Sequence, residues 1–239
     1  MRYFIVSVFF MMLVSCGKEF KRNPVDILIR DMTTSESFSI LLYDMDVQGN
    51  FSKDYFHKYR IIETKNNETD EVITDWLQVP EDYFKRHVNN MGMEIAAKSP
   101  DGEVSKIASP PGYSSYVGNE KYGTWRQRNG TSFWEFYGQY AFMSSMFNMA
   151  TYPVRRSYYD DYYGNYRGRR PYYGPSAGGS RMYGTGSSYS RRHKSNTSWS
   201  RNPRSSSFRQ RVNNSVRRSR SGSRYSSSSM RSRGGGFGK

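Results

Sequence analysis

The chain changes character near residue 150, and this change limits what it can fold into. Residues 1–150 carry 16 lysines and arginines against 19 aspartates and glutamates, and they contain most of the isoleucine, leucine and valine. Residues 151–239 carry 20 lysines and arginines against two aspartates, and they consist mainly of serine, arginine, glycine and tyrosine. Such an asymmetry of charge is typical of a folded body with a basic interaction tail.

The chain begins with an arginine close to its first residue, followed by a short apolar segment. Residues 3–14 carry no charge and are too few to span a bilayer, which takes about 20 apolar residues. A cationic start, a short apolar segment and a small residue before the cleavage site are typical of a secretory signal peptide, here residues 1–15. The segment ends in Leu13-Val14-Ser15-Cys16, and Cys16 is the single cysteine of the chain.

These four residues resemble the lipobox of bacterial lipoproteins, in which an aliphatic residue, a variable position and a small residue precede an invariant cysteine. The resemblance implies cleavage between Ser15 and Cys16, a diacylglycerol on the Cys16 thiol, and residues 16–23 as a lipid-anchored linker in the cell envelope. Gly17 is not the aspartate that retains lipoproteins in the inner membrane in the enteric pattern, so the outer membrane is favoured. An ordinary signal peptide with an incidental cysteine and a buried N-terminal strand are the alternatives.

Residues 24–108 are expected to form a small α+β domain with a mostly antiparallel sheet, because short connections join the predicted elements. Apolar residues at helical spacing predict helices over residues 24–32 and 80–91, each with a proline at its start. Runs of β-branched, aromatic and other apolar residues predict strands over residues 37–47, 55–63, 71–77, 93–98 and 103–108. A polar loop is expected at residues 65–71. In the second strand, one face is expected to carry Tyr55, His57, Tyr59 and Ile61.

Residues that could carry chemistry are sparse in this sequence. The three histidines, His57, His87 and His193, are spread over a predicted strand, a predicted helix and the tail. Asp44 and Asp46 alternate along one strand but lack the glycine and glutamate of a calcium loop. We therefore expect these side chains at the surface, no metal or cofactor, and no enzymatic activity. An envelope enzyme, the opposing hypothesis, would need a pocket where histidine and carboxylate converge.

A linker rich in glycine, proline and tyrosine, residues 109–131, leads to an aromatic segment, residues 132–150, that we expect to be a helix. Glu135 would complete a capping box with Thr131 or Ser132. Three alternatives stay open: the helix packs on the sheet, lies on a bilayer beside the lipid anchor, or spans the membrane. The side chains expected to contact a membrane or a partner are Phe133, Trp134, Phe136, Tyr140, Met143 and Phe147.

Residues 151–239 are expected to be disordered, because a segment with almost no aliphatic residues cannot bury enough apolar surface to offset its conformational entropy. The guanidinium group of arginine matches phosphate and carboxylate groups and stacks on aromatic rings. Polyanion binding is therefore expected from Arg155, Arg156, Arg169, Arg170, Arg191, Arg192, Arg217, Arg218 and Arg220. A solvated spacer without a fixed partner is the alternative.

The sequence as a whole favours a non-enzymatic lipoprotein of the bacterial cell envelope. Its basic tail would bind partner proteins or anionic envelope components, such as lipid headgroups, lipopolysaccharide or teichoic acid. The alternative is a membrane-anchored protein that binds nucleic acid, because arginine interleaved with tyrosine also suits phosphate contacts and stacking on bases. The sequence identifies no protein partner.

Overall fold

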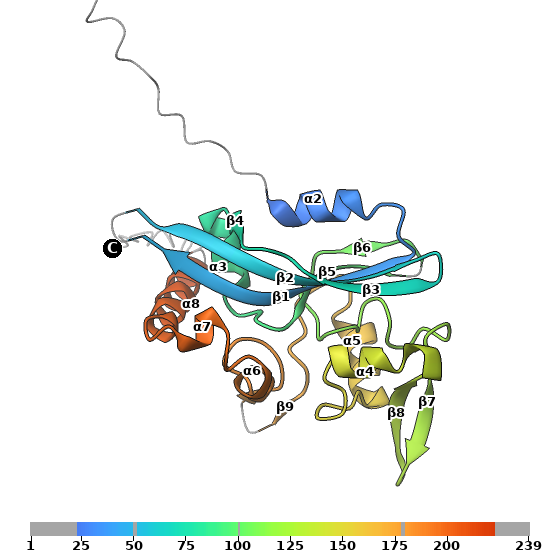
Figure 1. The fold of residues 1–239 in the computed structure, drawn as a ribbon. Coiled ribbons are helices and arrows are strands. Elements are labelled where there is room, and N and C mark those ends of the chain that lie inside the picture. The colour runs from blue at the N-terminus through green and yellow to red at the C-terminus, as the bar shows by residue number, and fades with distance from the viewer. Residues whose placement is uncertain (1–22, 50–51, 100, 178–179, 223–239) are drawn as a thin grey trace, which may run out of the picture.

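The computed structural model describes residues 23–49, 52–99, 101–177 and 180–222, and its centre is a six-stranded antiparallel sheet (Figure 1). The strands follow the order β3-β2-β1-β5-β6, and β4 also pairs with β2. Their bounds are β1 (Ser37–Gln48), β2 (Asp54–Lys65), β3 (Glu68–Ile73), β4 (Leu77–Val79), β5 (Glu94–Lys98) and β6 (Val104–Ser105). The expected α+β class and the mostly antiparallel sheet are confirmed.

The remaining elements of the described part are helices and two short hairpins outside the central sheet. They are α2 (Pro24–Asp31), α3 (Glu81–His87), β7 (Gly123–Arg128), β8 (Thr131–Phe136), η2 (Gly138–Tyr140), α4 (Phe142–Met146), α5 (Arg156–Asn165), β9 (Ser176–Ala177), β10 (Ser180–Arg181), α6 (Ser188–His193), α7 (Ser198–Arg201) and α8 (Ser205–Gly222). The expected signal peptide, the lipobox and Cys16 lie outside the described residues.

The two predicted helices of the body are present. Asn23 caps α2, because its Oδ1 accepts a hydrogen bond from the backbone N–H of Val25 at 3.1 Å. Helix α2 lies over one face of the sheet (Figure 1). Helix α3 ends at His87, four residues before the predicted end at residue 91.

The two faces of the sheet pack against different parts of the chain. Successive residues of a strand point to opposite faces. Ile40 and Tyr59 therefore join a core cluster with α2 and α3, to which Trp199 and Val212 near the C-terminus also belong. Leu41 and Ile62 join a second cluster with side chains from residues 113–172. The sheet is thus covered on both faces, and segments after β6 contribute to both clusters.

Two tight turns produce strands where the sequence analysis expected a loop and a linker. Asn66 and Asn67, with φ of 53° and 64°, join β2 directly to β3. Asn129 and Gly130, with φ of 47° and 74°, join β7 to β8. Asparagine and glycine adopt the left-handed conformation at low cost, which suits the two-residue turns of hairpins. The expected polar loop at residues 65–71 is therefore wrong.

The expected helix over residues 132–150 is also wrong. Residues 131–136 form strand β8, and only the short η2 and α4 follow. Trp134 and Phe136 are buried while Glu135 between them is exposed, which is the period of a strand. Glu135 caps no helix, and its carboxylate lies 3.9 Å from Arg126 and 3.7 Å from Arg128 across the hairpin.

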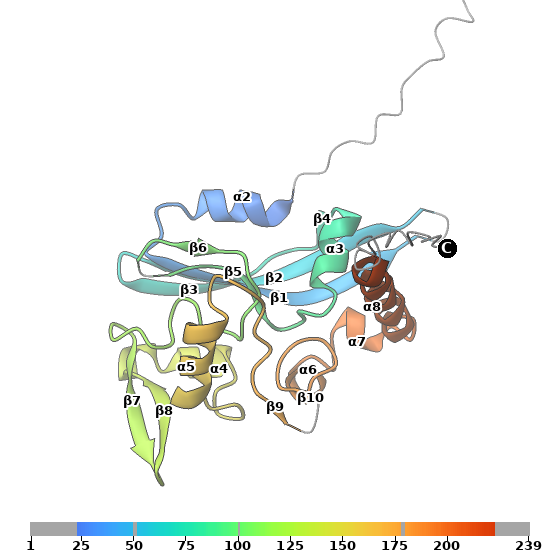
Figure 2. The same ribbon diagram turned by 180° about the vertical axis from the view of Figure 1, so that it is seen from behind.

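Residues 151–177 and 180–222 form helices and a short hairpin against the body, where we expected disorder. Figure 2 shows α4 and α5 beneath one part of the sheet and α6, α7 and α8 beneath the other. This segment supplies aromatic and aliphatic side chains to three buried clusters: Trp199, Val212, Tyr162, Tyr172, Tyr183 and Tyr189. Aromatic side chains bury about 150–250 Å² each, so they replace the missing aliphatic residues. Residues 223–239 lie outside the described part, and disorder there stays a prediction.

Candidate anion-binding pocket

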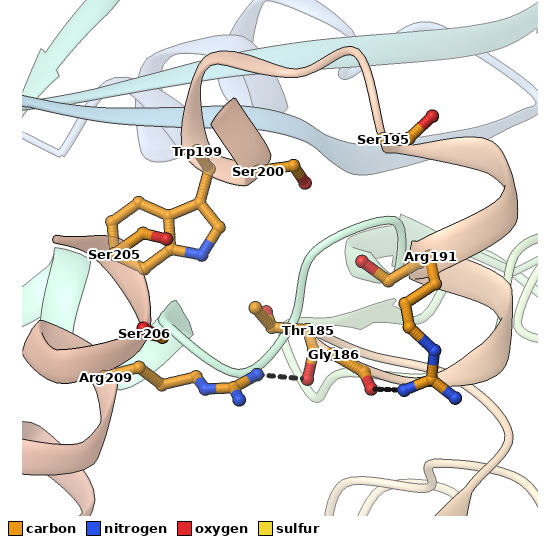
Figure 3. Close-up of a pocket in the computed structure, with 10 residues that line it drawn as sticks. Thr185, Gly186, Arg191, Ser195, Trp199, Ser200, Ser205, Ser206 and Arg209 are labelled. Carbon is orange, nitrogen blue, oxygen red and sulfur yellow. Dashed lines mark hydrogen bonds between the residues drawn. The ribbon is translucent and has the colours of Figure 1, made fainter. Parts of the chain in front are cut away.

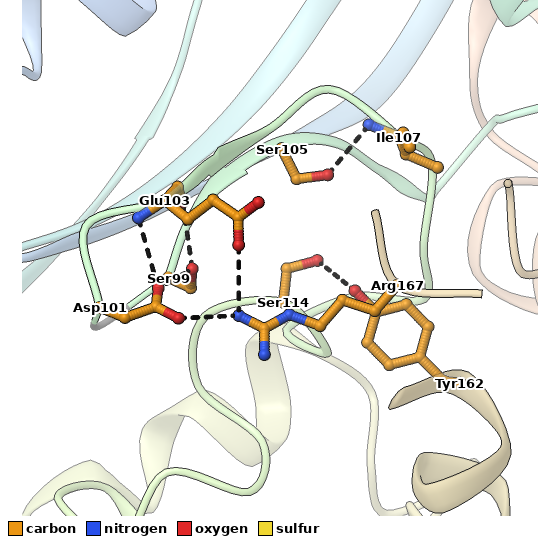
Figure 4. Close-up of polar contacts among 8 residues, drawn as sticks. All are labelled: Ser99, Asp101, Glu103, Ser105, Ile107, Ser114, Tyr162 and Arg167. Carbon is orange, nitrogen blue, oxygen red and sulfur yellow. Dashed lines mark hydrogen bonds and ion pairs between the residues drawn. The ribbon is translucent and has the colours of Figure 1, made fainter. Parts of the chain in front are cut away.

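Polar contacts hold the start of the basic segment against the body (Figure 4). A guanidinium nitrogen of Arg167 lies 3.2 Å from the carboxylate of Asp101 and 4.0 Å from that of Glu103. The hydroxyl of Tyr162 lies 2.9 Å from that of Ser114. These contacts join α5 and the residues just after it to the loops that follow β5 and β6.

The last helices enclose an open pocket with a volume of about 340 Å³ (Figure 3). We call it the serine–arginine pocket. Its lining comes from the loop before α6, from α6 and α7, and from the first turns of α8: Thr185, Gly186, Ser190, Arg191, Ser195, Trp199, Ser200, Ser205, Ser206 and Arg209. The lining contains two arginines and no acidic residue, so the pocket carries positive charge.

The loop before α6 is fixed to the body by one threonine. The Oγ1 of Thr185 accepts a hydrogen bond from the backbone N–H of Met91 at 3.0 Å and donates one to the carbonyl of Val88 at 2.7 Å. Gly186 has a φ of +78°, and a Cβ there would lie 2.4 Å from a guanidinium nitrogen of Arg209. Glycine at residue 186 therefore lets the arginine lie directly against the loop backbone.

Helix α7 is positioned by a carboxylate of the sheet. Asp44 of β1 accepts hydrogen bonds from the backbone N–H groups of Ser198 at 2.7 Å and Trp199 at 3.2 Å. The Trp199 ring packs against Phe84 of α3 and Phe208 of α8, with centroids 5.7 and 6.2 Å away. We expected Asp44 at the surface, and this prediction is wrong because the side chain serves as a buried cap for α7.

The two arginines approach the same loop from different helices (Figure 3). Arg191 of α6 donates a hydrogen bond to the carbonyl of Gly186, and Arg209 of α8 donates one to the carbonyl of Thr185, both at 2.6 Å. A guanidinium has five N–H donors, so each arginine keeps donors for a ligand. Two positive groups held by adjacent carbonyls favour an oxyanion such as a phosphate or a carboxylate.

Hydroxyl groups complete the set of donors around the pocket. Ser195 and Ser200 are exposed, and Ser206 lies in the first turn of α8. A serine hydroxyl can donate a hydrogen bond to an anion, and the N-terminus of a helix carries a partial positive charge. The pocket can therefore bind a phosphate group through charge and through several hydrogen bonds. It has no residue set for acid–base catalysis in its lining.

Of the arginines expected to bind polyanions, Arg191 alone lines this pocket. Arg192 is exposed on the same helix, and the side chains of Arg217, Arg218 and Arg220 in α8 lie outside the described part. The others lie at or near α5, on the other side of the molecule (Figure 1). There Arg155 stacks on Phe133 and Tyr158, Arg156 stacks on Trp125, Arg170 stacks on Tyr166, and Arg169 donates a hydrogen bond to the carbonyl of Gly164.

The side chains expected to contact a membrane or a partner lie mostly in the core. Trp134, Phe136, Tyr140, Met143 and Phe147 are buried in the cluster that contains Leu41 and Ile62 of the sheet. Phe133 is half-buried, with Arg155 over its ring. The prediction of a contact surface is therefore wrong for the five buried residues. Of the three alternatives, packing on the sheet is the one that these residues follow. They do so from a strand and two short helices, not from one helix.

The expected surface position of the body histidines is wrong. His57 is buried and His87 is half-buried, and their ring centroids lie 6.4 Å apart. The Nδ1 of His57 lies 3.0 Å from the hydroxyl of Tyr59, and the Nδ1 of His87 lies 3.0 Å from the amide nitrogen of Asn90. Burial lowers the pKa of both rings. Among the described residues, no group of three or more His, Cys, Asp or Glu is placed to hold a metal ion.

Arg209, Thr185 and Asp44 are parts of one site that the sequence alone does not predict. Arg209 stands in a serine- and arginine-rich segment like many others, and only the fold brings it to residues 185–186. Asp44 lies 154 residues before Ser198 in the chain. Helix α7 does have a local signal in the sequence. Thr197 is a good N-cap residue, and its side chain accepts a hydrogen bond from Ser200 N. The prediction of disorder did not take this capping residue into account.

Comparisons with known proteins identify no relative: no family model, no curated protein and no solved structure matches this chain. In the described part of residues 23–222, no helix has both the length and the apolar composition needed to cross a membrane.

Proposed function

We propose that this protein is a non-enzymatic lipoprotein of the bacterial cell envelope that binds anionic envelope components. A lipid on Cys16 anchors it to a membrane, with the outer membrane favoured in a cell that has two. Its C-terminal segment binds phosphate groups of lipid headgroups or of anionic polymers. The observation that carries the binding proposal is the serine–arginine pocket, in which Arg191 and Arg209 converge without an acidic residue in the lining.

The charge of the whole segment supports the same function. Residues 151–239 have 20 basic residues against two aspartates, so an anionic surface attracts this part of the molecule more than the body. A basic side chain near an anionic bilayer contributes about 1 kcal/mol. The pocket adds a geometric element to this attraction, because bidentate guanidinium contacts select planar or tetrahedral oxyanions.

The burial of several tyrosines after residue 150 weighs against the nucleic-acid alternative. Stacking on bases needs exposed rings. Tyr162, Tyr172, Tyr183 and Tyr189 are buried, which removes them from such stacking. Tyr163 is 55% exposed, so part of the stacking surface is left. The phosphate contacts would serve any phosphate polymer, so we place nucleic acid second.

The binding proposal is tested with point variants rather than by removing the segment, because Trp199 and Val212 belong to the main core cluster. The chain from residue 16 onward with Cys16→Ser is mixed with phosphatidylcholine vesicles that contain or lack phosphatidylglycerol. We expect binding to the anionic vesicles alone, weakened by salt. Replacing both pocket arginines, Arg191→Gln and Arg209→Gln, should weaken it about tenfold or more.

A charge-matched control separates the pocket from net charge. Arg30→Gln with Arg128→Gln removes two exposed arginines of α2 and β7. This control should bind nearly as well as the parent chain, and circular dichroism should show that both double variants fold. Equal losses in the two double variants would refute a role for the pocket. Tighter binding to duplex DNA than to inorganic polyphosphate at matched charge and salt would favour the nucleic-acid alternative.

The anchor is tested separately in a bacterium that processes lipoproteins. The parent chain should incorporate labelled palmitate and sediment with membranes, because two or more acyl chains give stable anchoring. The Cys16→Ser variant should incorporate no label, since the thiol is the acceptor. Equal labelling of the two chains, or a mature chain that does not begin at Cys16, would show that the lipobox resemblance is incidental.

A further inference from the structure

A second pocket lies between the β7–β8 hairpin and α5 and shares no lining residue with the serine–arginine pocket. We call it the aromatic pocket. Its volume is about 770 Å³, within the range of about 300–1,000 Å³ for small-molecule sites. Trp125 and Trp134 line it from the hairpin, Tyr159 and Tyr163 from α5, and Tyr137 from the residue after β8.

The aromatic rings form a row along this pocket. The centroid of Tyr159 lies 5.6 Å from that of Trp125 and 6.0 Å from that of Tyr163. Tyr163 is 55% exposed and Tyr137 is 42% exposed. The guanidinium of Arg167 lies 4.9 Å from the centroid of the Tyr163 ring, so Tyr163 offers a ligand the part of its surface that this arginine leaves open. Gly118 has a φ of +79°, and a Cβ there would lie 2.5 Å from the Tyr159 hydroxyl. Glycine at residue 118 therefore lets the central ring of the row lie against the backbone.

Charged side chains stand beside the rings. The guanidinium of Arg156 lies 5.4 Å from the centroid of the Trp125 ring and 3.7 Å from the carboxylate of Asp160. Glu120 adds an exposed carboxylate. The lining thus carries two carboxylates against one guanidinium, which disfavours an anionic ligand. The face of Trp125 already holds Arg156, which disfavours a cation caged by the rings.

Hydroxyl groups are the ligand groups that suit this lining. A hydroxyl can donate to the carboxylates of Glu120 and Asp160 and accept from the guanidinium of Arg156.

We propose that the aromatic pocket binds a saccharide of neutral pyranose units. A pyranose ring presents C–H groups on its faces, which pack on aromatic rings, and hydroxyl groups on its rim, which bond to carboxylates and guanidinium groups. The exposed rings of Tyr137 and Tyr163 suit the faces of pyranose units. Glu120, Asp160 and Arg156 suit the hydroxyls. This site is independent of the anion binding proposed above.

The test is a titration of the chain from residue 16 onward, with Cys16→Ser, by the trisaccharides of N-acetylglucosamine and of glucose. Binding is followed by calorimetry and by the fluorescence of the tryptophans. We expect at least one trisaccharide to bind. Tyr163→Ala and Tyr137→Ala, at exposed rings whose removal leaves the core intact, should each weaken binding about fivefold or more.

The matched control is Phe142→Ala, which removes a 40% exposed ring outside this pocket and should leave the affinity unchanged. Inorganic polyphosphate should not compete with the saccharide, since it is expected in the other pocket. The proposal is overturned if neither trisaccharide binds, if both tyrosine variants bind as tightly as the parent chain, or if choline binds in this pocket in place of the saccharides.

Discussion

His57 of β2 is buried, and the half-buried His87 of α3 lies beside it. Tyr83 packs on the His87 ring at 4.5 Å between centroids. Burial lowers the pKa of His87 to about 4 and holds the pKa of His57 well below its ordinary value. Nearby positive charge adds to the effect at each ring, from Arg86 at His87 and from His87 at His57. At the residue scale, these two rings link the fold to pH.

The sign of this linkage follows from which state binds the proton. Below about pH 6.5 the unfolded chain protonates its histidines, whereas folded His87 stays neutral until about pH 4. The free energy of unfolding should therefore fall as pH drops from about 6.5 to about 4, by about 3 kcal/mol for His87 alone. Urea denaturation at a series of pH values measures this loss.

Two histidine variants show whether His87 contributes. His87→Gln should reduce the pH dependence between about pH 6.5 and 4 by the share of His87, while His57, whose pKa is also lowered, keeps its own share. His193→Gln removes a less buried histidine of α6 and should keep most of it. A parent protein whose stability is constant over this interval, or equal slopes in both variants, would contradict the assignment.

At the element scale, one carboxylate of β5 organises the segment that leaves the sheet. Glu94 is fully buried and accepts hydrogen bonds from the hydroxyls of Ser39 and Ser109 and from the backbone N–H groups of Gly112 and Ser114. Burial raises the pKa of Glu94, and the hydrogen bonds from the serines oppose this shift. The loop at residues 109–114 is thereby fixed to the face of the sheet where the second core cluster forms.

Replacing this carboxylate tests the role of the four donors. Glu94→Gln keeps the size of the side chain but turns one acceptor oxygen into an amide that donates, so some of the donors face no acceptor. We expect the free energy of unfolding to fall by about 2–4 kcal/mol, measured with urea. Glu103→Gln, at an exposed glutamate of the nearby turn, should change it by less than about 0.5 kcal/mol. A similar small change in both variants would mean that the loop is held by its apolar contacts.

At the scale of the whole molecule, the basic segment after residue 150 contributes side chains both to the core and to the charged surface. Its tyrosines and tryptophan fill the clusters beneath the sheet, while arginines such as Arg191 and Arg192 remain exposed on α6. Arg167 pairs with acids of the body instead. One stretch of chain therefore supplies packing through its aromatic residues and binding through its arginines.

The strands of the body could be predicted because each contains a continuous run of apolar, β-branched and aromatic residues. Strands β1 and β2 follow the expected ranges nearly to the residue, and Tyr55 and Tyr59 share the core face as expected. Helix α2 likewise begins at the predicted proline. The β7–β8 hairpin had a local signal too, since Asn129-Gly130 is the residue pair that favours a two-residue turn. The aromatic segment that follows this pair led instead to the prediction of a helix over residues 132–150.

The C-terminal half could not be predicted in the same way. Few of its residues are aliphatic, and its helices α6 and α7 have six and four residues, too short to be stable alone. They form because the body supplies hydrogen-bond acceptors. Asp44 accepts from the first turn of α7, and the carbonyl of Val88 accepts from Thr185 in the loop before α6. The serine–arginine pocket exists only when these long-range contacts form.

The sequence by itself determined the α+β class, the antiparallel pairing of β1 with β2 and the excess of positive charge after residue 150, because periodicity, short connections and composition are local properties of a chain. Only the tertiary structure decided that Asp44 and Glu94 are buried anchors and that Arg191 meets Arg209. The physical reason is that burial, desolvation and the convergence of charges depend on which distant segments pack together.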